Sequence, residues 1–339
     1  MNNRNSLNTL RFMAASQVLL VHAFNHLDVI TPNYIKPVLF LFPGVAIFFV
    51  LSGYLIWQSL EKSSSYSVYL KKRVFRIYPE LWGGVFIEVI VIMLFGKTLI
   101  KLTDMLLFVV SQGSIFQFWT PDSLRWFGCG TPNGALWTIS MIIQFYIVVY
   151  FLYKILNRRS IKIWILFFSF TIICAIGVTL SSDYLPMIIS KLLSVSLFRY
   201  LWMFVIGMFL AEYRKKISPV INKRWYVFLG IAVLYKFFNL KLVLPNDYYD
   251  IILTILLSYG WIGFAYAVPK LNIKTDISYG MYIYHMIIIN IMIELGFIGE
   301  MKYIIWTFII SCTCAYISSV SLGRISKQMK GKLLNEKRF

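Results

Sequence analysis

The chain has 339 residues, of which 59% are hydrophobic and 14% are charged, and its mean hydropathy is +0.72. This composition excludes an ordinary soluble domain and indicates a polytopic membrane protein. The net charge of +19 does not indicate a nucleic-acid partner, because the Lys and Arg residues cluster between apolar runs, as membrane topology requires.

The first apolar run, Leu10–Phe24, carries one arginine and one histidine. Arg11 and His22 are eleven positions apart, which on a helix leaves them about 20° from alignment and about 16 Å apart along the axis. Ionisable groups inside a membrane segment are costly and usually face a bundle interior or a water-filled cavity. The pair is therefore a candidate functional site. No small-residue cleavage site follows the run, so we interpret it as a retained span and not as a signal peptide.

Ten apolar runs are long enough to cross about 30 Å of hydrocarbon, which takes about 20 helical residues. They predict an all-α fold, a polytopic transmembrane helix bundle of about ten spans. The expected spans are 7–27, 38–60, 80–96, 136–156, 162–180, 193–213, 225–241, 250–268, 276–296 and 303–322. The run 102–118 contains interrupting polar residues and is assigned to an outer loop or a membrane-surface segment.

Basic residues cluster in alternate connections and at the C-terminal end, in the segments 62–76, 154–162, 214–224, 270–274 and 324–338. Because cytoplasmic connections carry an excess of Lys and Arg, both termini are predicted to be cytoplasmic. We expect one transmembrane domain over 1–322 and a basic cytoplasmic tail over 323–339. The tail is suited to contact with anionic lipids of the inner leaflet.

His22 is placed beyond the middle of the first span, as counted from the cytoplasm. A neutral imidazole there can accept a proton from a hydroxyl group, and its ordinary pKa suits a general base. The alternative is a histidine that hydrogen-bonds between helices, and the alignment with Arg11 favours the functional interpretation. His26, one turn further on, is interpreted as an interfacial residue near the outer surface that pairs with Asp28.

A metal site is not expected. His22 and His26 have the spacing of two ligands on one helix face, but Ala23 follows the first histidine where a zincin has Glu, and no acidic cluster completes a site. The four cysteines form no disulfide or zinc pattern either.

The second span contains Gly44, Ser52 and Gly53 among bulky residues. Small residues let membrane helices approach closely, so close packing is the simpler interpretation. A catalytic or substrate-binding role for Ser52 is the alternative.

The segment KKRVFRIYP places Arg73 and Arg76 three positions apart on one helix face. Paired guanidinium groups at the cytoplasmic surface suit phosphate, because each can bind two oxygens. The alternative is the general excess of positive charge on the cytoplasmic side. The sequence has no Gly-rich phosphate loop, which disfavours a nucleotide triphosphatase.

Three later stretches carry further candidates for substrate binding or for structure. Asn133 lies in the turn before the fourth span and Trp137 near its start, and both could line an acceptor cavity, although an aromatic belt with capping residues explains them equally well. Arg199 lies in the first third of the sixth span and needs an anionic or carbonyl partner. Tyr282 and His285 lie in SYGMYIYH, where the histidine is either a second catalytic or orienting group or an interhelical hydrogen-bond donor.

Five stretches together resemble the acyltransferase 3 family of integral membrane O-acyltransferases. They occur in the family's order and span nearly the whole chain. They are the Arg-x10-His pair of Arg11 and His22, IFFVLSGYLI at 47–56, the Arg-x-x-Arg of Arg73 and Arg76, NGALWT at 133–138 and SYGMYIYH at 278–285.

The resemblance implies an acyl-coenzyme A donor reached from the cytoplasm and a carbohydrate or similar hydroxyl acceptor. Acetyl is the group most often transferred in that family, and its products include modified O-antigen, capsule and Nod-factor sugars. Carried over to this chain, His22 is the catalytic histidine and Arg11 its partner in the motif. Arg73 and Arg76 match the motif associated with coenzyme A phosphates.

The chain departs from the family at one position. The family often has an acidic residue shortly after LWT, whereas this chain has Met141, Ile142 and Ile143 before Gln144. Glu88, Glu80 or Asp28 would have to supply the carboxylate, or the mechanism does without one.

We therefore expect an O-acyltransferase of the bacterial cytoplasmic (inner) membrane, with acetyl-coenzyme A as donor and no metal. Its expected partners are a cell-surface glycan or lipid-linked saccharide and membrane lipids, and the sequence leaves the oligomeric state open. One rival is a transporter or flippase in which Arg11, His22, Arg199 and His285 line a path. The inverted repeats and broken spans of transporters are not evident. A catalytically lapsed member of the family is a third interpretation.

Overall fold

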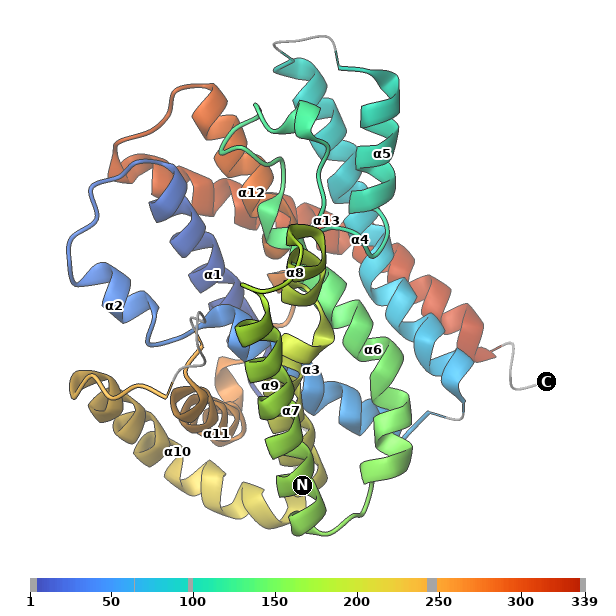
Figure 1. The fold of residues 1–339 in the computed structure, drawn as a ribbon, viewed down its shortest axis with the longest axis vertical. Coiled ribbons are helices and arrows are strands. Elements are labelled where there is room, and N and C mark those ends of the chain that lie inside the picture. Colours follow the sequence, from blue (N-terminus) through green and yellow to red (C-terminus); the bar gives the residue numbers. More distant parts are fainter. Residues whose placement is uncertain (1–4, 64, 97–99, 243–248, 336–339) are drawn as a thin grey trace. The chain divides into compact units, whose positions relative to one another are not determined.

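The computed structural model describes residues 5–63, 65–96, 100–242 and 249–335, and every regular element in these ranges is a helix (Figure 1). Six helical segments of the described chain are long and apolar enough to cross a membrane. They are Pro37–Leu60, Tyr66–Leu94, Gly134–Leu156, Ile161–Ser181, Met187–Glu212 and Met301–Ser326. The all-α, multi-pass membrane fold is thus confirmed, whereas the total of ten spans and the orientation of the termini stay predictions.

The helices follow one another along the chain. The longer ones are α1 (Leu7–His26), α3 (Gly44–Leu60), α4 (Tyr66–Leu94), α5 (Leu102–Gln112), α6 (Trp137–Leu156), α7 (Ile161–Ser181), α9 (Leu197–Glu212), α10 (Arg214–Phe237), α11 (Ile251–Ala267), α12 (Ser278–Glu294) and α13 (Met301–Asn335). The short ones are α2 (Ile35–Leu39), α8 (Met187–Ser194), η1 (Asp122–Leu124), η2 (Gly134–Leu136) and η3 (Pro269–Leu271).

α4 begins at Tyr66 and continues through Pro79, so the helix starts well before residue 80, where the predicted span begins. A proline inside a helix lacks the N–H that would bind the carbonyl four residues earlier. Here that carbonyl belongs to Phe75, and it accepts a hydrogen bond from the Ser326 hydroxyl instead. The helix passes the proline because another part of the chain supplies the missing donor.

Other bounds differ in a similar way. α13 has 35 residues and does not stop at the predicted end of the span at 322. Its length is about 52 Å, against about 30 Å of hydrocarbon, so the start of the predicted tail is helical. In α10 the backbone leaves helical geometry at Arg224, immediately before the predicted span 225–241. α5 has 11 residues and is too short to cross a bilayer, in agreement with a non-spanning segment at 102–118.

The chain folds into two compact units. The first contains the residues up to Ala14, Val38–Tyr66 and Met141–Lys274, and the second contains Ala15–Pro37, Ser67–Ser140 and the residues from Thr275 onward. α1 contributes its first turns to one unit and the rest to the other.

In the first unit α3 packs on α9 and α10 packs on α11. A Cβ added at Gly53 would lie 2.1 Å from the Phe204 carbonyl oxygen, and one added at Gly207 would lie 1.9 Å from the Val50 carbonyl oxygen. Only glycine allows the two backbones to approach this closely. The packing interpretation of the small residues in the second predicted span is confirmed for Gly53.

Gln144 of α6 binds the connection between α8 and α9 in the first unit. Its Nε2 donates to the Val195 carbonyl at 3.0 Å, and its Oε1 accepts from the Leu197 N–H at 2.9 Å. Leu197 is the first residue of α9, and the first N–H groups of a helix have no partner within the helix. Gln144, which follows the position of the missing acidic residue, therefore acts as a helix cap.

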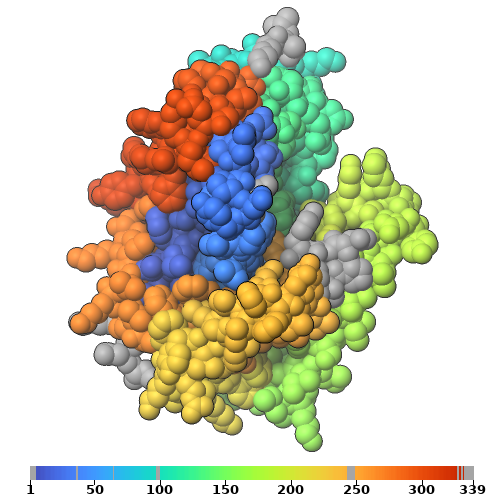
Figure 2. Space-filling view, turned by 90° about the vertical axis from the view of Figure 1, so that its left-hand side faces the viewer, coloured from blue at the N-terminus to red at the C-terminus, as the bar shows by residue number. Residues whose placement is uncertain are grey.

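α10 exposes a long apolar surface in the first unit. Tyr226 is 60% exposed, Val233 51% and Phe237 79%, and the helix lies open along one face of the molecule, yellow in Figure 2. Exposed apolar side chains of this density fit a surface that faces lipid.

In the second unit α12 and α13 form a helical hairpin, and α4 packs against both. A Cβ added at Gly280 of α12 would lie 2.8 Å from the Ala315 Cα of α13, and one added at Gly84 of α4 would lie 2.2 Å from Ile283 Cγ2. The Tyr284 hydroxyl donates to Ser318 Oγ at 3.2 Å. This core fixes the direction in which the opposite face of α12 presents its side chains.

Candidate functional site

Three histidines meet in the second unit. The ring centroids of His22 on α1 and His285 on α12 are 5.3 Å apart with an angle of 51° between the planes. His26 stacks on His22 at 5.7 Å with an angle of 14°. The chain contains only three histidines, so all of them belong to this group, which we call the histidine cluster.

His285 has a defined protonation pattern. The side chain is 1% exposed, and its Nδ1 lies 3.1 Å from the Met281 carbonyl oxygen. Because a carbonyl only accepts, Nδ1 carries the hydrogen and Nε2 keeps a lone pair. That Nε2 is buried and has no hydrogen-bond partner within the described residues. His285 therefore presents a hydrogen-bond acceptor from the same ring that contacts His22.

The cluster is not arranged as a metal site. His22 contacts both other rings, and among the residues that the structure describes no three His, Cys, Asp or Glu side chains converge as ligands of one ion. The three imidazole rings instead form a row in which His22 lies between His285 and His26.

The NGALWT segment docks on α12 beside the cluster. Asn133 Nδ2 donates to the Ile283 carbonyl at 3.0 Å. The Tyr282 hydroxyl donates to the Ala135 carbonyl at 2.7 Å and accepts from Thr138 Oγ1 at 2.5 Å. The centroids of the Tyr282 and His285 rings are 5.7 Å apart. The stretches NGALWT and SYGMYIYH, which were separate candidates in the sequence, thus form one site.

Asn133 keeps one polar atom without a partner. The residue is 3% exposed, and its Oδ1 is buried and unpaired within the described residues. A buried amide oxygen without a partner costs about 1–3 kcal/mol. Such a group is suited to accept a hydrogen bond from a bound molecule.

Sequence reasoning missed how the loop before this segment is held. Asn290 of α12 donates to the Thr131 and Pro132 carbonyls at 3.0 and 2.7 Å and accepts from the Cys129 N–H at 3.0 Å. The next residue toward the N-terminus, Gly128, has φ +56° and would place a Cβ 2.1 Å from Asn290 Oδ1. A glycine is therefore required at position 128, and the Gly-x-Gly pattern at 128–130 is the signal of this loop in the sequence.

The two arginines of the Arg-x-x-Arg motif lie on α4, as predicted. Arg76 Nη2 lies 3.0 Å from Asp276 Oδ2, and Asp276 Oδ1 accepts from the backbone N–H of Ser278, the first residue of α12, at 3.2 Å. The Arg73 guanidinium lies 5.6 Å from the centre of the Tyr69 ring. Asp276 was not among the sequence candidates.

Three predicted residues belong to the first unit. Arg11 Nη1 lies 3.5 Å from Asn8 Oδ1, and Arg199 lies 5.7 Å from the centre of the Tyr200 ring. Ser52 is half-buried on α3. In the second unit, Trp137 is the half-buried first residue of α6.

The carboxylates considered as replacements are placed differently. Asp28 interacts electrostatically with His26. Glu88 lies on α4, is 0% exposed, and neither of its oxygens has a hydrogen-bond partner among the described residues. The neighbour of His22 in the site is the second imidazole, His285.

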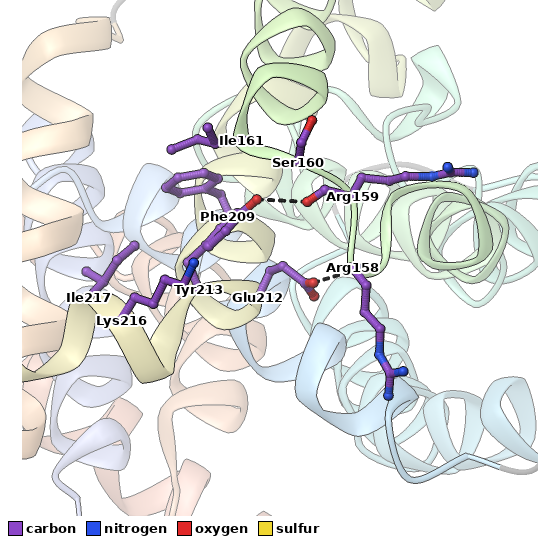
Figure 3. A pocket seen from close by; sticks show the side chains of 9 residues that line it. All are labelled: Arg158, Arg159, Ser160, Ile161, Phe209, Glu212, Tyr213, Lys216 and Ile217. Atoms are coloured by element: carbon purple, nitrogen blue, oxygen red, sulfur yellow. Dashed lines mark hydrogen bonds between the residues drawn. The ribbon is translucent and has the colours of Figure 1, made fainter.

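A pocket of about 450 Å³ lies in the first unit at the turn between α6 and α7. Its lining residues are Arg158, Arg159, Ser160, Ile161, Phe209, Glu212, Tyr213, Lys216 and Ile217. Figure 3 shows that the guanidinium groups of Arg158 and Arg159 point away from the other side chains. Glu212 accepts from the Arg158 N–H at 2.7 Å, and the Tyr213 hydroxyl donates to the Arg159 carbonyl at 2.8 Å. None of the candidate catalytic or binding residues predicted from the sequence lines this pocket.

Comparison with known proteins covers almost the entire chain. Residues 4–323 match the acyltransferase domain family. The chain is 26% identical over 332 residues to nodulation protein 10 of Rhizobium leguminosarum bv. viciae, which covers 88% of this chain and 86% of that protein. It is also 26% identical over 351 residues to the O-acetyl transferase of Shigella phage Sf6, with 97% and 96% covered. No solved structure matches the chain.

Proposed function

Because this chain belongs to the acyltransferase domain family and is a membrane O-acyltransferase, we propose that it transfers an acetyl group from acetyl-coenzyme A to a hydroxyl of a cell-surface glycan or of its lipid-linked precursor. The name of the phage relative, an O-acetyl transferase, supports the choice of acetyl. The observation that carries the proposal is the contact of His22 with His285 beside the docked NGALWT segment.

His22 is the general base in this mechanism. His285 donates from Nδ1 to a backbone carbonyl, so its Nε2 can accept a hydrogen bond from one ring nitrogen of His22. The other nitrogen of His22 then carries the lone pair that takes the proton of the acceptor hydroxyl. His285 acts as the positioning residue that fixes the orientation and tautomer of the base, a role that an acidic residue often has.

Asn133 and Tyr282 form the acceptor side of the site. The unpaired Oδ1 of Asn133 can accept a hydrogen bond from a second hydroxyl of the sugar. Tyr282 holds the segment through the Ala135 carbonyl and Thr138, and its ring lies against His285. The segment thus links acceptor binding to the orientation of the cluster.

Arg73 and Arg76 bind the donor phosphates. Both lie on α4 with helical spacing, and planar guanidinium groups match phosphate oxygens two at a time. Arg11 is assigned to positioning the donor by its place in the Arg-x10-His motif, because about 16 Å along the helix axis separates it from His22. The proposed mechanism does not use Ser52 or Arg199.

The reaction needs few groups. The acceptor oxygen attacks the thioester carbonyl carbon while His22 takes its proton, a carbon–oxygen bond forms and the carbon–sulfur bond breaks. The thiolate of coenzyme A leaves with the bonding electron pair. Because a thiolate is a competent leaving group, a base, correct positioning and charge stabilisation are sufficient.

The proposed setting is the bacterial cytoplasmic membrane, with about ten spans and both termini in the cytoplasm. In this orientation the basic connections and the Arg-x-x-Arg motif face the donor pool, and His26 lies toward the opposite surface. The proposal includes one transmembrane domain over residues 1–322 and a basic cytoplasmic tail over residues 323–339.

The proposal is tested by mass analysis of the surface polysaccharide from cells that express wild type, His22→Ala or the double variant Arg73→Ala/Arg76→Ala at matched levels. We expect an acetyl-sized increment in wild type that is lost in His22→Ala. Loss in the double variant that is restored in membranes by a raised donor concentration would support the donor role. A wild type that adds no increment to any glycan would refute the proposed acceptor, and an increment retained in His22→Ala would refute the base.

A further inference from the structure

The histidine cluster extends from the interior to the end of α1. His285 is 1% exposed, whereas His22 and His26 are both half-buried. His26 is the last residue of α1, and its neighbour on the same helix, Asn25, is exposed. The mechanism above uses His22 and His285 and leaves His26 without a role.

The rings of the stacked pair lie within the reach of one bridging water molecule. The rings of His22 and His26 are one helical turn apart, nearly parallel, with centroids at 5.7 Å. One water molecule can bridge polar atoms that are too far apart for a direct hydrogen bond. His285 cannot serve as the exit in this way, because it is buried and its Nδ1 is bound to the Met281 carbonyl.

Few charged groups face His26. On its own segment, Asp28 interacts with it electrostatically and is itself exposed. From α12, His285 belongs to the same cluster. The connection before α13 touches this region through the Gly299 N–H, which donates to the Leu27 carbonyl at 2.8 Å, and its charged residue Glu300 is paired with Lys302 at 2.7 Å. Among the described residues Asp28 is thus the carboxylate that can favour a positive charge on His26.

We propose that His26 carries the proton of the acceptor hydroxyl from His22 to the water at the C-terminal end of α1, so that each acetyl transfer releases one proton at that surface. The inference rests on the proposed function, because it takes His22 as the base.

The step balances without another reactant. The acceptor O–H bond breaks, its proton binds His22, and His22 passes a proton to His26 and from there to water. The thiolate of coenzyme A takes one proton from the water on the donor side and leaves as the thiol. If donor and acceptor are reached from opposite surfaces, each turnover consumes a proton on one side of the membrane and releases one on the other.

Proton release can be measured in inverted membrane vesicles from cells that make the acceptor glycan. The vesicles contain trapped pyranine, a pH-sensitive dye, and receive radiolabelled acetyl-coenzyme A outside, so that label in the glycan and acid in the lumen are recorded together. We expect one lumenal proton per acetyl group transferred. Label transfer without lumenal acidification overturns the inference but leaves the proposed function intact, whereas absence of label transfer in wild type refutes the proposed function itself.

Variants of His26 separate proton transfer from packing. His26→Phe keeps a flat ring against His22 but cannot carry a proton, and Asn25→Ala is the matched control on the same turn. We expect the kcat of His26→Phe to fall about tenfold, below the effect of losing a direct general base. The KM for acetyl-coenzyme A should not change. Imidazole loaded into the lumen should restore the rate, because it replaces the missing carrier.

A structural role would give a different result. If His26→Phe transfers acetyl at the wild-type rate, or if its rate is low and lumenal imidazole does not restore it, the inference is wrong. His26→Gln provides the second variant, since it keeps polarity without stacking, and imidazole should restore it as well. Asn25→Ala should match wild type with and without imidazole.

Discussion

The ion pair between Arg76 and Asp276 allows a quantitative test of the donor site. The two side chains are 37% and 14% exposed, and Nη2 lies 3.0 Å from Oδ2. A donor phosphate that binds Arg76 competes with this carboxylate. Pairs of this exposure contribute about 1 kcal/mol or less, and 1 kcal/mol corresponds to about a fivefold change in an equilibrium constant. Asp276→Asn should therefore lower the KM for acetyl-coenzyme A up to about fivefold.

The substitution preserves the local structure. An asparagine Oδ1 can still accept from the Ser278 N–H, which Asp276 Oδ1 does in the wild type, so the start of α12 keeps this hydrogen bond. The assay is the rate of label transfer from acetyl-coenzyme A in membranes at several donor concentrations. Glu300→Gln is the matched control, because it removes the same charge from the pair with Lys302 at 2.7 Å. A KM that is unchanged or higher in Asp276→Asn would refute competition at Arg76.

Two further predictions concern packing and the loop on α12. Gly207→Ala would bring a Cβ within 1.9 Å of the Val50 carbonyl oxygen, so we expect a loss of about 1–3 kcal/mol in the free energy of unfolding, seen as a lower melting temperature in detergent. Gly177→Ala, which meets no atom within 4 Å, should not lower it. Burial raises the pKa of the Cys129 thiol, so less thiolate is present at neutral pH and maleimide labelling should be slow and increase with pH. Asn290→Ala removes the bond to the Cys129 N–H and should speed labelling, and equal rates would contradict this reading of the loop.

The fold class could be predicted because apolar runs of bilayer length are a local signal. The alignment of Arg11 and His22 is local too, since it follows from the helical period, and both residues lie on α1. Motif order sufficed to identify the family, which the match over residues 4–323 confirms. These properties depend on neighbours in sequence.

Helix ends were harder to predict because they depend on distant partners. A proline normally ends a helix, yet α4 continues past Pro79 because Ser326, far along the chain, supplies the donor for the Phe75 carbonyl. The basic tail was expected to be a separate region, and α13 continues into it to Asn335. Neither the continuation of α4 past Pro79 nor that of α13 to Asn335 can be predicted from the residues next to it in sequence.

The site shows the same limit. Asn133 and the Ile283 carbonyl are 150 positions apart, and Arg76 and Asp276 are 200 apart. The residues of each motif could be proposed, but their contacts could not. The sequence predicts an interfacial residue at His26, and its stacking on His22, which has no local signal, places it in the cluster as well. The presence of only three histidines in the chain was the one available hint.

The most direct measurement of the central claim is the rate of acetyl transfer in membranes that contain His22→Gln, compared with wild type and with Asn25→Ala. The account predicts that kcat falls by about 10²–10⁴, the contribution of a general base, while the KM for acetyl-coenzyme A and the amount of folded protein stay unchanged. Asn25→Ala should keep the wild-type rate. If His22→Gln transfers acetyl within about threefold of wild type, far less than the loss of a base requires, then His22 does not take the proton.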